Sequence, residues 1–216
     1  MVTSHVALGV SAAILAGGRA RRFGGVDKAS LAVGRARIID RQLAALSAVA
    51  DDIRIVADRA DRYPDAGVRV IPDAIPNAGP LGGLYTALVD ARHDWSIILA
   101  CDLPFVTAAL LERLLIERDV DERAEAIVPR SARGLEPLCA VYRRNCAEAA
   151  RARIARGALR VDGLLEDVRA RVLAAEALAP DDAGLLFENV NTPHDHERAR
   201  AWVQLNEKPS KDRITE

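Results

Sequence analysis

The stretch from Ile14 to Lys28 reads I-L-A-G-G-R-A-R-R-F-G-G-V-D-K and contains four glycines, three arginines and a closing lysine. Glycine lets backbone N–H groups approach a ligand closely, because it has no Cβ. Arginine and lysine add positive charge at the same place, and a backbone cradle with cations suits a polyphosphate. The stretch therefore predicts a nucleoside triphosphate site. The plainer alternative is a surface loop that is merely rich in glycine and arginine.

The spacing of this stretch excludes the two common phosphate-binding motifs. A P-loop needs a lysine directly after a glycine and then a hydroxyl residue for the metal. Here Val26 and Asp27 come before Lys28, and the next residue, Ala29, has no hydroxyl. A dinucleotide fingerprint needs G-x-G-x-x-G, which the two glycine pairs do not fit.

Asp102 lies two positions after the apolar run 97–100, which is typical of a buried strand. Ligands of open α/β sheets bind beyond the carboxyl ends of the strands. Mg²⁺ prefers one or two carboxylates together with substrate phosphates. Asp102 is therefore a candidate Mg²⁺ ligand, and the alternative is an aspartate that only caps a helix or shapes a turn.

Asp73 follows another predicted strand and precedes the segment Gly79-Pro80-Leu81-Gly82-Gly83. Glycines at the start of a helix expose backbone N–H groups to an anion or a base. This segment is a second candidate for nucleotide binding, and the alternative is a tight loop that caps a helix.

Lys28 ends the glycine stretch and is the candidate catalytic cation. A reaction at a phosphate group builds negative charge on the phosphate oxygens and on the leaving group, which a lysine stabilises electrostatically. Arg22 is expected to assist with the phosphates, whereas Arg19 and Arg21 are expected to face solvent.

Hydrophobic periodicity predicts alternating strands and helices. Apolar and β-branched runs predict strands at 6–16, 53–56, 68–71, 96–100, 126–129 and 138–142. Helical spacing predicts helices at 38–49, 84–91, 108–118, 146–156, 161–172 and 193–205, with Thr107, Asn145 and Thr192 as N-caps. Residues 187–191 are expected to form a short strand or a loop. The alternation predicts an α/β fold, a three-layer α/β/α domain around a mostly parallel, doubly wound, Rossmann-like sheet.

Composition limits the classes of protein that this chain could belong to. Its 216 residues suit a single domain, expected at 6–205, with a disordered tail at 206–216. The net charge of −1 argues against a nucleic-acid partner. Three cysteines without C-x-x-C spacing predict reduced thiols and a cytoplasmic protein. No apolar stretch reaches 18 residues, so no membrane span is expected.

The pattern L-A-G-G-x-x-x-R-x-G-G-x-D-K resembles the signature of the molybdenum cofactor guanylyltransferases. These belong to the wider nucleotidyltransferase family that includes the sugar-nucleotide pyrophosphorylases, so the resemblance implies a fold of the nucleotide-diphospho-sugar transferase type. It also implies that the loop wraps the triphosphate and that its first residues contact the base. The residues that carry the pattern are Leu15, Ala16, Gly17, Gly18, Arg22, Gly24, Gly25, Asp27 and Lys28.

Three later segments also resemble that family. Residues 101–104 look like its metal-binding C-D-x-P segment, and residues 189–193 look like its N-x-N-T-P segment, which implies a metal or phosphate ligand at Asn191. Residues 136–142 look like the segment on the acceptor side. Asp102 and Asn191 are the implied metal ligands. The implied nucleotide-binding residues are Leu15, Ala16, Gly17, Gly18, Lys28, Asp73, Gly79, Pro80, Leu81, Gly82 and Asp102.

One departure from the family pattern concerns the base. A polar residue that contacts the nucleotide in some guanylyltransferases falls near Val56, which is apolar here. Contact with the base through that side chain is therefore in doubt.

The resemblance implies transfer of GMP from GTP to the molybdopterin form of the molybdenum cofactor, with Mg²⁺ as cofactor and pyrophosphate as product. It also implies contact with other proteins of molybdenum cofactor biosynthesis or with molybdoenzymes. The same chemistry with CTP, or with another phosphorylated acceptor, is the nearest alternative. A nucleotide-binding module without turnover is an alternative of another class.

Overall fold

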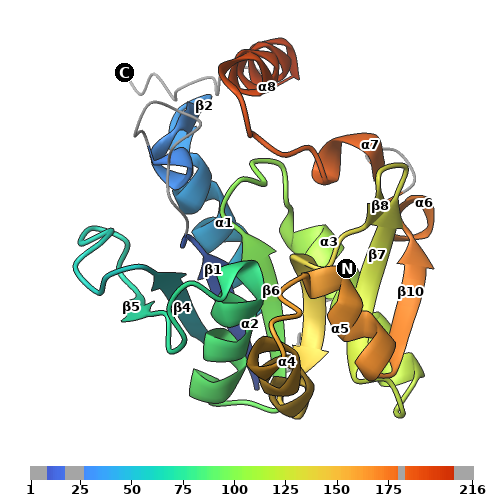
Figure 1. The fold of residues 1–216 in the computed structure, drawn as a ribbon. Coiled ribbons are helices and arrows are strands. Elements are labelled where there is room, and N and C mark those ends of the chain that lie inside the picture. The colour runs from blue at the N-terminus through green and yellow to red at the C-terminus, as the bar shows by residue number, and fades with distance from the viewer. Residues whose placement is uncertain (1–8, 18–26, 180–182, 207–216) are drawn as a thin grey trace.

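A computed structural model describes residues 9–17, 27–179 and 183–206, and its centre is one mixed β-sheet (Figure 1). The strands lie in the order β10-β7-β9-β6-β1-β4-β5, with the short β8 beside β7. Their bounds are β1 Val10–Leu15, β4 Asp52–Ala57, β5 Arg69–Pro72, β6 Trp95–Ala100, β7 Ala126–Ser131, β8 Gly134–Leu135, β9 Cys139–Arg143 and β10 Ala170–Ala174.

Strand β1 is the centre of the parallel part of the sheet. It pairs in parallel with β4 on one side and with β6 on the other, and all six of its residues are buried. A strand buried on both faces is near-continuously apolar, as this one is. Strand β9 runs antiparallel to β6 and to β7, so the sheet is mostly parallel, as predicted.

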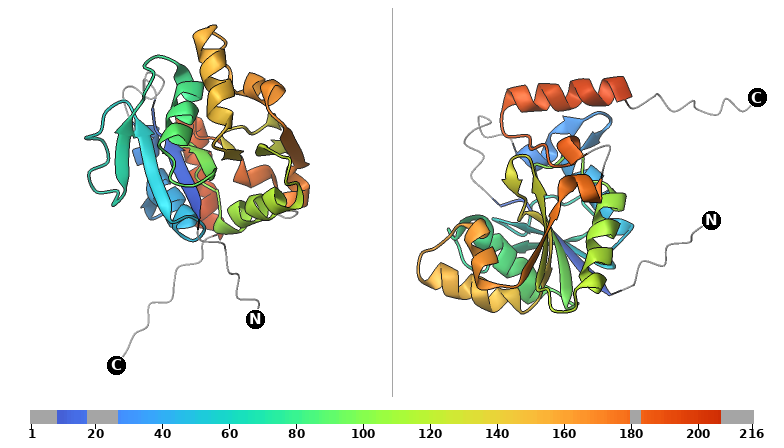
Figure 2. Two further views of the ribbon diagram at one scale, coloured as in Figure 1. Left: turned by 90° about the horizontal axis from the view of Figure 1, so that it is seen from below. Right: turned by 90° about the vertical axis from the view of Figure 1, so that its right-hand side faces the viewer.

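Helices cover both faces of the sheet, which confirms the three-layer prediction (Figures 1 and 2). Alternate residues of β1 face opposite layers: Ile14 packs in one core and Leu15 in the other. The helices of the Ile14 side are α1 Ile38–Ser47, α3 Ala108–Val120 and the short α6 Ala175–Leu178. Those of the Leu15 side are α2 Gly79–Asp90, α4 Cys146–Ala155 and α5 Val161–Asp167.

A small third core lies beyond the carboxyl ends of the parallel strands. There, the helix α8 (Pro193–Asn206) packs on the hairpin of β2 (Ala32–Val33) and β3 (Ala36–Arg37), as Figure 2 shows. Trp202 of α8 stacks edge-on against Phe105, with ring centroids 5.1 Å apart. The single turn η2 (Lys28–Ser30) leads into this hairpin, and α7 (Ala183–Leu186) precedes the segment that enters α8.

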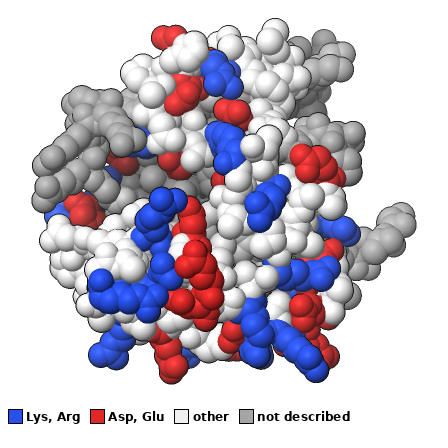
Figure 3. Space-filling view, turned by 45° about the vertical axis from the view of Figure 1, so that its right-hand side comes forward, with Lys and Arg blue, Asp and Glu red and all other residues white. Residues whose placement is uncertain are grey.

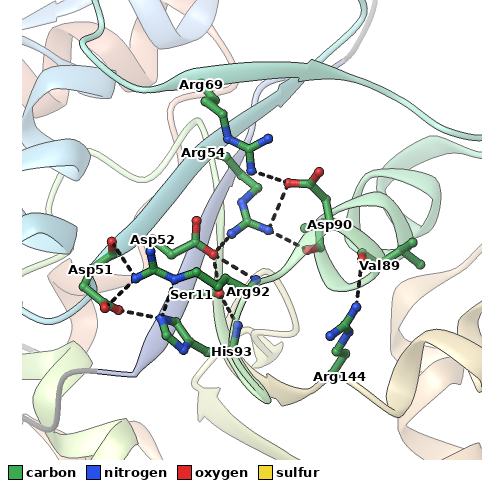
Figure 4. A network of polar contacts seen from close by, with 11 residues as sticks. Ser11, Asp51, Asp52, Arg54, Arg69, Val89, Asp90, Arg92, His93 and Arg144 are labelled. Carbon is green, nitrogen blue, oxygen red and sulfur yellow. Dashed lines mark hydrogen bonds and ion pairs between the residues drawn. The ribbon is translucent and has the colours of Figure 1, made fainter.

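At the amino ends of the parallel strands, the buried side chain of Arg54 connects β4 to α2 (Figure 4). Only 1% of its side chain is exposed, and it pairs with Asp52 and, at 3.3 Å, with Asp90. It also donates to the carbonyl of Ala87. Asp52 in turn accepts a 2.6 Å bond from the Ser11 hydroxyl. A buried charge needs such partners, so this network is a structural anchor far from the carboxyl ends of those strands.

On the surface, basic and acidic side chains lie interspersed on the face that Figure 3 shows. Several of the molecule's ion pairs share a partner or cross between elements: Arg153 and Arg156 both pair with Asp167, and Arg171 pairs with Glu117. None of the helices in the described ranges is both long and apolar enough to cross a membrane.

Three details of the predicted elements are wrong. The helix predicted at 161–172 ends at Asp167, because residues 170–174 pair with β7 as an edge strand. Helix α2 begins at Gly79 rather than at 84, since Pro80 suits the first turn of a helix. Asn145 has helical backbone angles and gives its side chain to Glu125, so it is not a cap. Residues 187–191 form a loop, which is one of the two forms predicted for them. The periodicity also missed the short β8, α6 and α7.

The caps predicted at the other two helices are confirmed. The Thr107 hydroxyl accepts from the N–H of Leu110. Thr192 and Asp195 form a reciprocal capping box: the Thr192 hydroxyl accepts from the N–H of Asp195, and the Asp195 carboxylate accepts from the N–H of Thr192. The domain bounds 6–205 and the disordered tail stay predictions, because residues 207–216 lie outside the described part of the chain.

The buried amide of Gln42 fixes the carboxyl end of β6. Its nitrogen donates to the carbonyls of Ala100 at 2.7 Å and Leu103 at 3.1 Å. The Gln42→Leu variant leaves both carbonyls without that donor, so we expect its free energy of unfolding to fall by about 1–3 kcal/mol. Urea denaturation measures this loss. The control Ser47→Ala, on the exposed face of the same helix, should stay within about 0.5 kcal/mol of wild type.

Candidate nucleotide-binding and catalytic site

The candidate site lies at the carboxyl ends of β1, β4, β5 and β6, where backbone hydrogen bonds join the segments that leave the sheet. The N–H of Cys101 donates to the carbonyl of Leu15, and the N–H of Ala16 donates to Val56. The N–H of Asp73 donates to Ala57. These bonds bring residues after four different strands to one edge, which is where open α/β sheets bind ligands.

Two adjoining cavities open at this edge. The smaller, of about 210 Å³, is lined by Ala16, Lys28, Cys101 and Asp102 among others. The larger, of about 870 Å³, reaches over Val56, Asp58, Asp73, Asn77 and Gly83. Leu15, Gly17, Asp27, Arg62 and Pro80 line both. Their shared lining residues join them into one trough, and the larger cavity is by itself within the size range of small-ligand sites.

Lys28 lies at the narrow end of this trough. Its ammonium donates a 2.6 Å hydrogen bond to Oδ1 of Asn191 and lies 3.9 Å from Oδ2 of Asp102. The preceding residue, Asp27, fixes the turn by accepting from the N–H of Ala29 at 3.2 Å. Lys28 is also the only lysine before residue 208 of the chain. The structure therefore brings together three of the residues that the sequence singled out.

The Asp102 carboxylate is largely buried, and one of its two oxygens is left without a hydrogen bond in the described part of the chain. No hydrogen-bond partner for its Oδ1 occurs among the described residues, although that atom is shielded from solvent. Burial raises the pKa of the Asp102 carboxyl, and the Lys28 ammonium opposes that rise. An acceptor in this state favours a cation or a donor from a ligand. Cys101 is no nucleophile, because burial raises the pKa of its thiol to about 12.

Asp73 presents a second unpaired carboxylate oxygen, at the wide end of the trough. Its Oδ1 is buried without a partner in the described part of the chain. Burial, followed by the neighbouring Asp58 carboxylate, raises its pKa. A Cβ at Gly17 would lie 3.2 Å from its Oδ2, and one at Gly83 would lie 3.6 Å from its Oδ1. The glycines therefore keep the space beside this carboxylate open.

The start of α2 borders both cavities. Gly79, with a φ of +61°, lines the larger one, and Pro80 lines both. Leu81 is fully buried in the core, so its side chain does not line the trough as its place among the binding residues implied. Gly82 is also buried: a Cβ there would lie 2.7 Å from the Cβ of Ala78, so packing demands this glycine.

Two of the implied site residues, Gly18 and Arg22, lie outside the described residues. Within the described ranges, no cluster of three or more His, Cys, Asp or Glu side chains could hold a metal by itself.

Arg62 is a site residue that sequence reasoning missed. Its guanidinium pairs with Asp27 at 2.6 Å and with Asp58 at 2.8 Å, and it donates to the hydroxyl of Tyr63. It thus ties the loop after β4 to the end of the glycine stretch. The only available signal was its position in a polar segment after a strand, at the same sheet edge as the other site residues.

The segment predicted on the acceptor side contributes little to the trough. Of residues 136–142, Leu138 lines the smaller cavity, whereas the hydroxyl of the fully buried Tyr142 donates to Pro137. Glu136 accepts a 2.6 Å bond from Ser131, and burial raises its pKa. Asn189 accepts from Arg133 at 2.9 Å. The hairpin of β7 and β8 is thereby joined to the segment that carries Asn191.

Known proteins share both the sequence pattern and the fold. Residues 12–172 match the MobA-like NTP transferase domain family. The molybdenum cofactor guanylyltransferase of Desulfosudis oleivorans is 32% identical over 196 residues, which are 90% of this chain and 96% of that protein.

Two solved structures share the fold. One is molybdopterin-guanine dinucleotide biosynthesis protein A from Archaeoglobus fulgidus, with a TM-score of 0.75, 23% identity, and coverage of 90% of this chain and 99% of that one. The other is 2-C-methyl-D-erythritol 4-phosphate cytidylyltransferase from Thermus thermophilus, with a TM-score of 0.66, 19% identity, and coverage of 91% and 100%.

This sheet, with a lysine and two buried carboxylates at the ends of its parallel strands, is that of an α/β nucleotidyltransferase. The fold is of the nucleotide-diphospho-sugar transferase type, as expected. The chain belongs to the family of MobA-like NTP transferase domains, and its curated relatives are molybdenum cofactor guanylyltransferases.

The raised pKa of Asp73 has a consequence for stability. The unfolded carboxyl ionises near its ordinary value, about 3.9, before the folded one does, so ionisation destabilises the fold above that pH. Asp73→Asn should therefore unfold at a higher temperature than wild type at pH 7, and the difference should shrink as the pH falls toward 4. Thermal unfolding at several pH values measures it.

Asp58→Asn is the control with the opposite sign, because the hydrogen bond from Arg62 lowers the pKa of Asp58. Its melting temperature at pH 7 should fall. An Asp73→Asn variant that is less stable than wild type at pH 7 would contradict the burial argument.

Proposed function

We propose that this nucleotidyltransferase transfers GMP from GTP to the molybdopterin form of the molybdenum cofactor and releases pyrophosphate. The observation that carries the proposal is the convergence of Lys28, Asp102 and Asn191 at the end of the glycine stretch. The names of the curated relatives support the choice of substrates.

The trough suggests how the nucleotide lies. The wide end, with the unpaired Asp73 oxygen and Gly17 beside it, suits the guanosine moiety, because a carboxylate accepts from N–H and O–H donors. The triphosphate then runs from the Gly17 side of the trough toward Lys28. Gly79 and Pro80 at the start of α2 border this path, where a helix N-terminus favours an anion.

The reaction needs no nucleophile from the protein. An oxygen of the acceptor's terminal phosphate attacks the α-phosphorus of GTP, and the bond from that phosphorus to the bridging oxygen of pyrophosphate breaks. A phosphate monoester is already largely ionised near neutral pH, with a second pKa of about 6, so no strong base is needed. Lys28 stabilises the charge that gathers on the phosphate oxygens, and positioning supplies much of the rest.

We also propose that the site takes Mg²⁺. The buried Oδ1 of Asp102, which has no partner among the described residues, is the kind of hard oxygen ligand that this ion prefers, and Asn191 offers a second such oxygen. Burial raises the pKa of Asp102, which means that the protein alone stabilises its negative charge poorly. A bound cation would compensate that charge. A bound Mg²⁺ would neutralise charge on the triphosphate and orient it.

The same proposal includes the compartment in which the protein acts and the proteins that it contacts. The cysteines Cys101, Cys139 and Cys146 are all free, as expected for work in the cytoplasm. A product that serves as a cofactor must pass to another protein, so contact with molybdenum cofactor biosynthesis proteins or molybdoenzymes follows from the reaction.

Transfer from CTP is the second candidate, and one observation favours it. Val56 lines the wide end of the trough and offers no hydrogen bond to guanine. The shared fold with a cytidylyltransferase leaves room for a pyrimidine.

A panel of nucleotides with Mg²⁺ tests the choice of base. A ligand that binds only the folded state raises the melting temperature according to its concentration over Kd, about 2.7 kcal/mol at 100 times Kd. We expect GTP to raise it more than CTP, ATP or UTP at equal concentration. Pyrophosphate release with molybdopterin as acceptor then tests the reaction. A larger shift with CTP would favour the second candidate, and GTP binding without pyrophosphate release would favour a module that only binds nucleotide.

Asp102→Ala tests the proposed metal site. This variant should lose Mg²⁺-dependent turnover and keep its fold, because the side chain that it removes is an unsatisfied acceptor rather than a packing group. The assay is pyrophosphate release across a Mg²⁺ titration, with circular dichroism for the fold. Glu136→Ala, which removes another carboxylate of raised pKa from outside the trough lining, is the matched control. Turnover of Asp102→Ala at the wild-type rate would exclude the metal assignment.

A further inference from the structure

We infer that Asp195, at the start of α8, is a positioning residue for Lys28. The inference rests on the proposed function, in which Lys28 is the catalytic cation. Asp195 does not line the trough and acts through Asn191. Nothing in the sequence pattern beyond its place in a capping box points to this role.

A short chain of hydrogen bonds joins the two residues. The Lys28 ammonium donates to Oδ1 of Asn191 at 2.6 Å. The backbone N–H of Asn191 donates to Oδ2 of Asp195 at 3.0 Å. The same oxygen also accepts from the N–H of Thr192 at 2.8 Å. One carboxylate oxygen thus holds two successive backbone N–H groups, beginning with that of the residue that binds the lysine.

The residue before Asn191 is hydrogen-bonded to Asp102, just beyond the carboxyl end of β6. The N–H of Val190 donates to the carbonyl of Asp102 at 2.8 Å. The backbone at Asn191 is therefore held between Asp102 and Asp195. With both neighbours fixed, its side chain can present Oδ1 to Lys28 in one direction.

Helix α8 also holds the segment that carries Lys28. His196 contacts the carbonyl of Ala32 through Nε2 at 2.7 Å, and Ala199 and Val203 pack with Val33 and Ile38. The segment after Lys28 and the segment that carries Asn191 thus both contact helix α8. The position of α8 sets the distance between them.

This arrangement matters because a lysine side chain is long and loses up to about 2 kcal/mol of rotamer freedom when it is held in one conformation. The Asn191 oxygen holds the ammonium in place and keeps it 3.9 Å from Asp102. A shift of about 1 Å at a catalytic group can cost on the order of 100-fold in rate. Release of the Asn191 backbone should therefore reduce turnover without touching the substrate.

A merely structural role for Asp195 is the competing explanation, because helix caps stabilise by about 1 kcal/mol on their own. The capping box offers a matched control. Thr192→Val removes the other half of the box, the bond from the N–H of Asp195 to the Thr192 hydroxyl, and leaves the bond between Asp195 and Asn191 in place. Asp195→Ala removes the bonds that its carboxylate accepts from the N–H groups of Asn191 and Thr192.

The kinetic test compares these variants by pyrophosphate release under saturating GTP, with thermal unfolding beside it. Both variants should lose similar stability. We expect kcat of Asp195→Ala to fall by about 10- to 100-fold and kcat of Thr192→Val to stay within about twofold of wild type. In an Asn191→Ala background, Asp195→Ala should lower kcat no further, because the hydrogen bond from Lys28 to the Asn191 side chain is already absent.

A second readout does not depend on activity. The chain has three lysines, Lys28, Lys208 and Lys211, so acetylation of each can be followed by peptide mass spectrometry in one sample. Loss of the bond to Asn191 should make Lys28 react severalfold faster, relative to the other two, in Asp195→Ala and in Asn191→Ala. Thr192→Val should leave the ratio unchanged.

The two readouts separate the inference from the proposed function. If wild type releases no pyrophosphate with any nucleotide and acceptor, the proposed function fails, and Lys28 labelling still decides the inference. Equal kcat and equal labelling in Asp195→Ala and Thr192→Val would reduce Asp195 to a helix cap.

Discussion

The hydrogen bond between the Lys28 ammonium and the Asn191 amide joins residues 163 positions apart in the chain. The candidate site depends on it, because it places the only lysine before residue 208 beside the Asp102 carboxylate. The bond can form only if β1 and β6 lie side by side and α8 returns across their carboxyl ends. The small third core of α8, β2 and β3 therefore helps to position the lysine. It also packs over the carboxyl ends of the parallel strands.

Buried charge is partnered to different degrees at the two ends of the parallel strands. At the amino end, Arg54 has two carboxylate partners and a backbone carbonyl, and only its Nε has no partner among the described residues. At the carboxyl edge, Asp73 and Asp102 each keep a buried oxygen for which the described residues provide no partner, and burial raises the pKa of both. An unpaired buried acceptor costs stability, and such groups gather where a ligand completes them. Without a ligand, the buried carboxylates of the candidate site are thus less well stabilised than the Arg54 network at the other end of the strands.

Prediction from the sequence succeeded where local signals agree with the tertiary structure. The apolar run of β1, the Thr107 N-cap of α3 and the capping box of α8 are local, and they hold. The helix predicted across 161–172 failed because Ala170–Ala174 gains a ladder of hydrogen bonds from β7, a partner about 40 residues away that periodicity cannot detect. Arg62 was missed for the same reason: its partner Asp27 lies on another segment.

The sequence by itself determined the class of the protein, since the glycine stretch, the aspartates after apolar runs and the alternation of elements are all readable in one dimension. It also singled out Lys28, Asp73 and Asp102 as candidate site residues. Only the tertiary structure decided how these groups meet: that Asn191 holds the lysine, that Leu81 is core, and that Asp195 connects a helix cap to the site. Hydrogen bonds and burial depend on distances between segments far apart in the chain, and folding alone sets those distances.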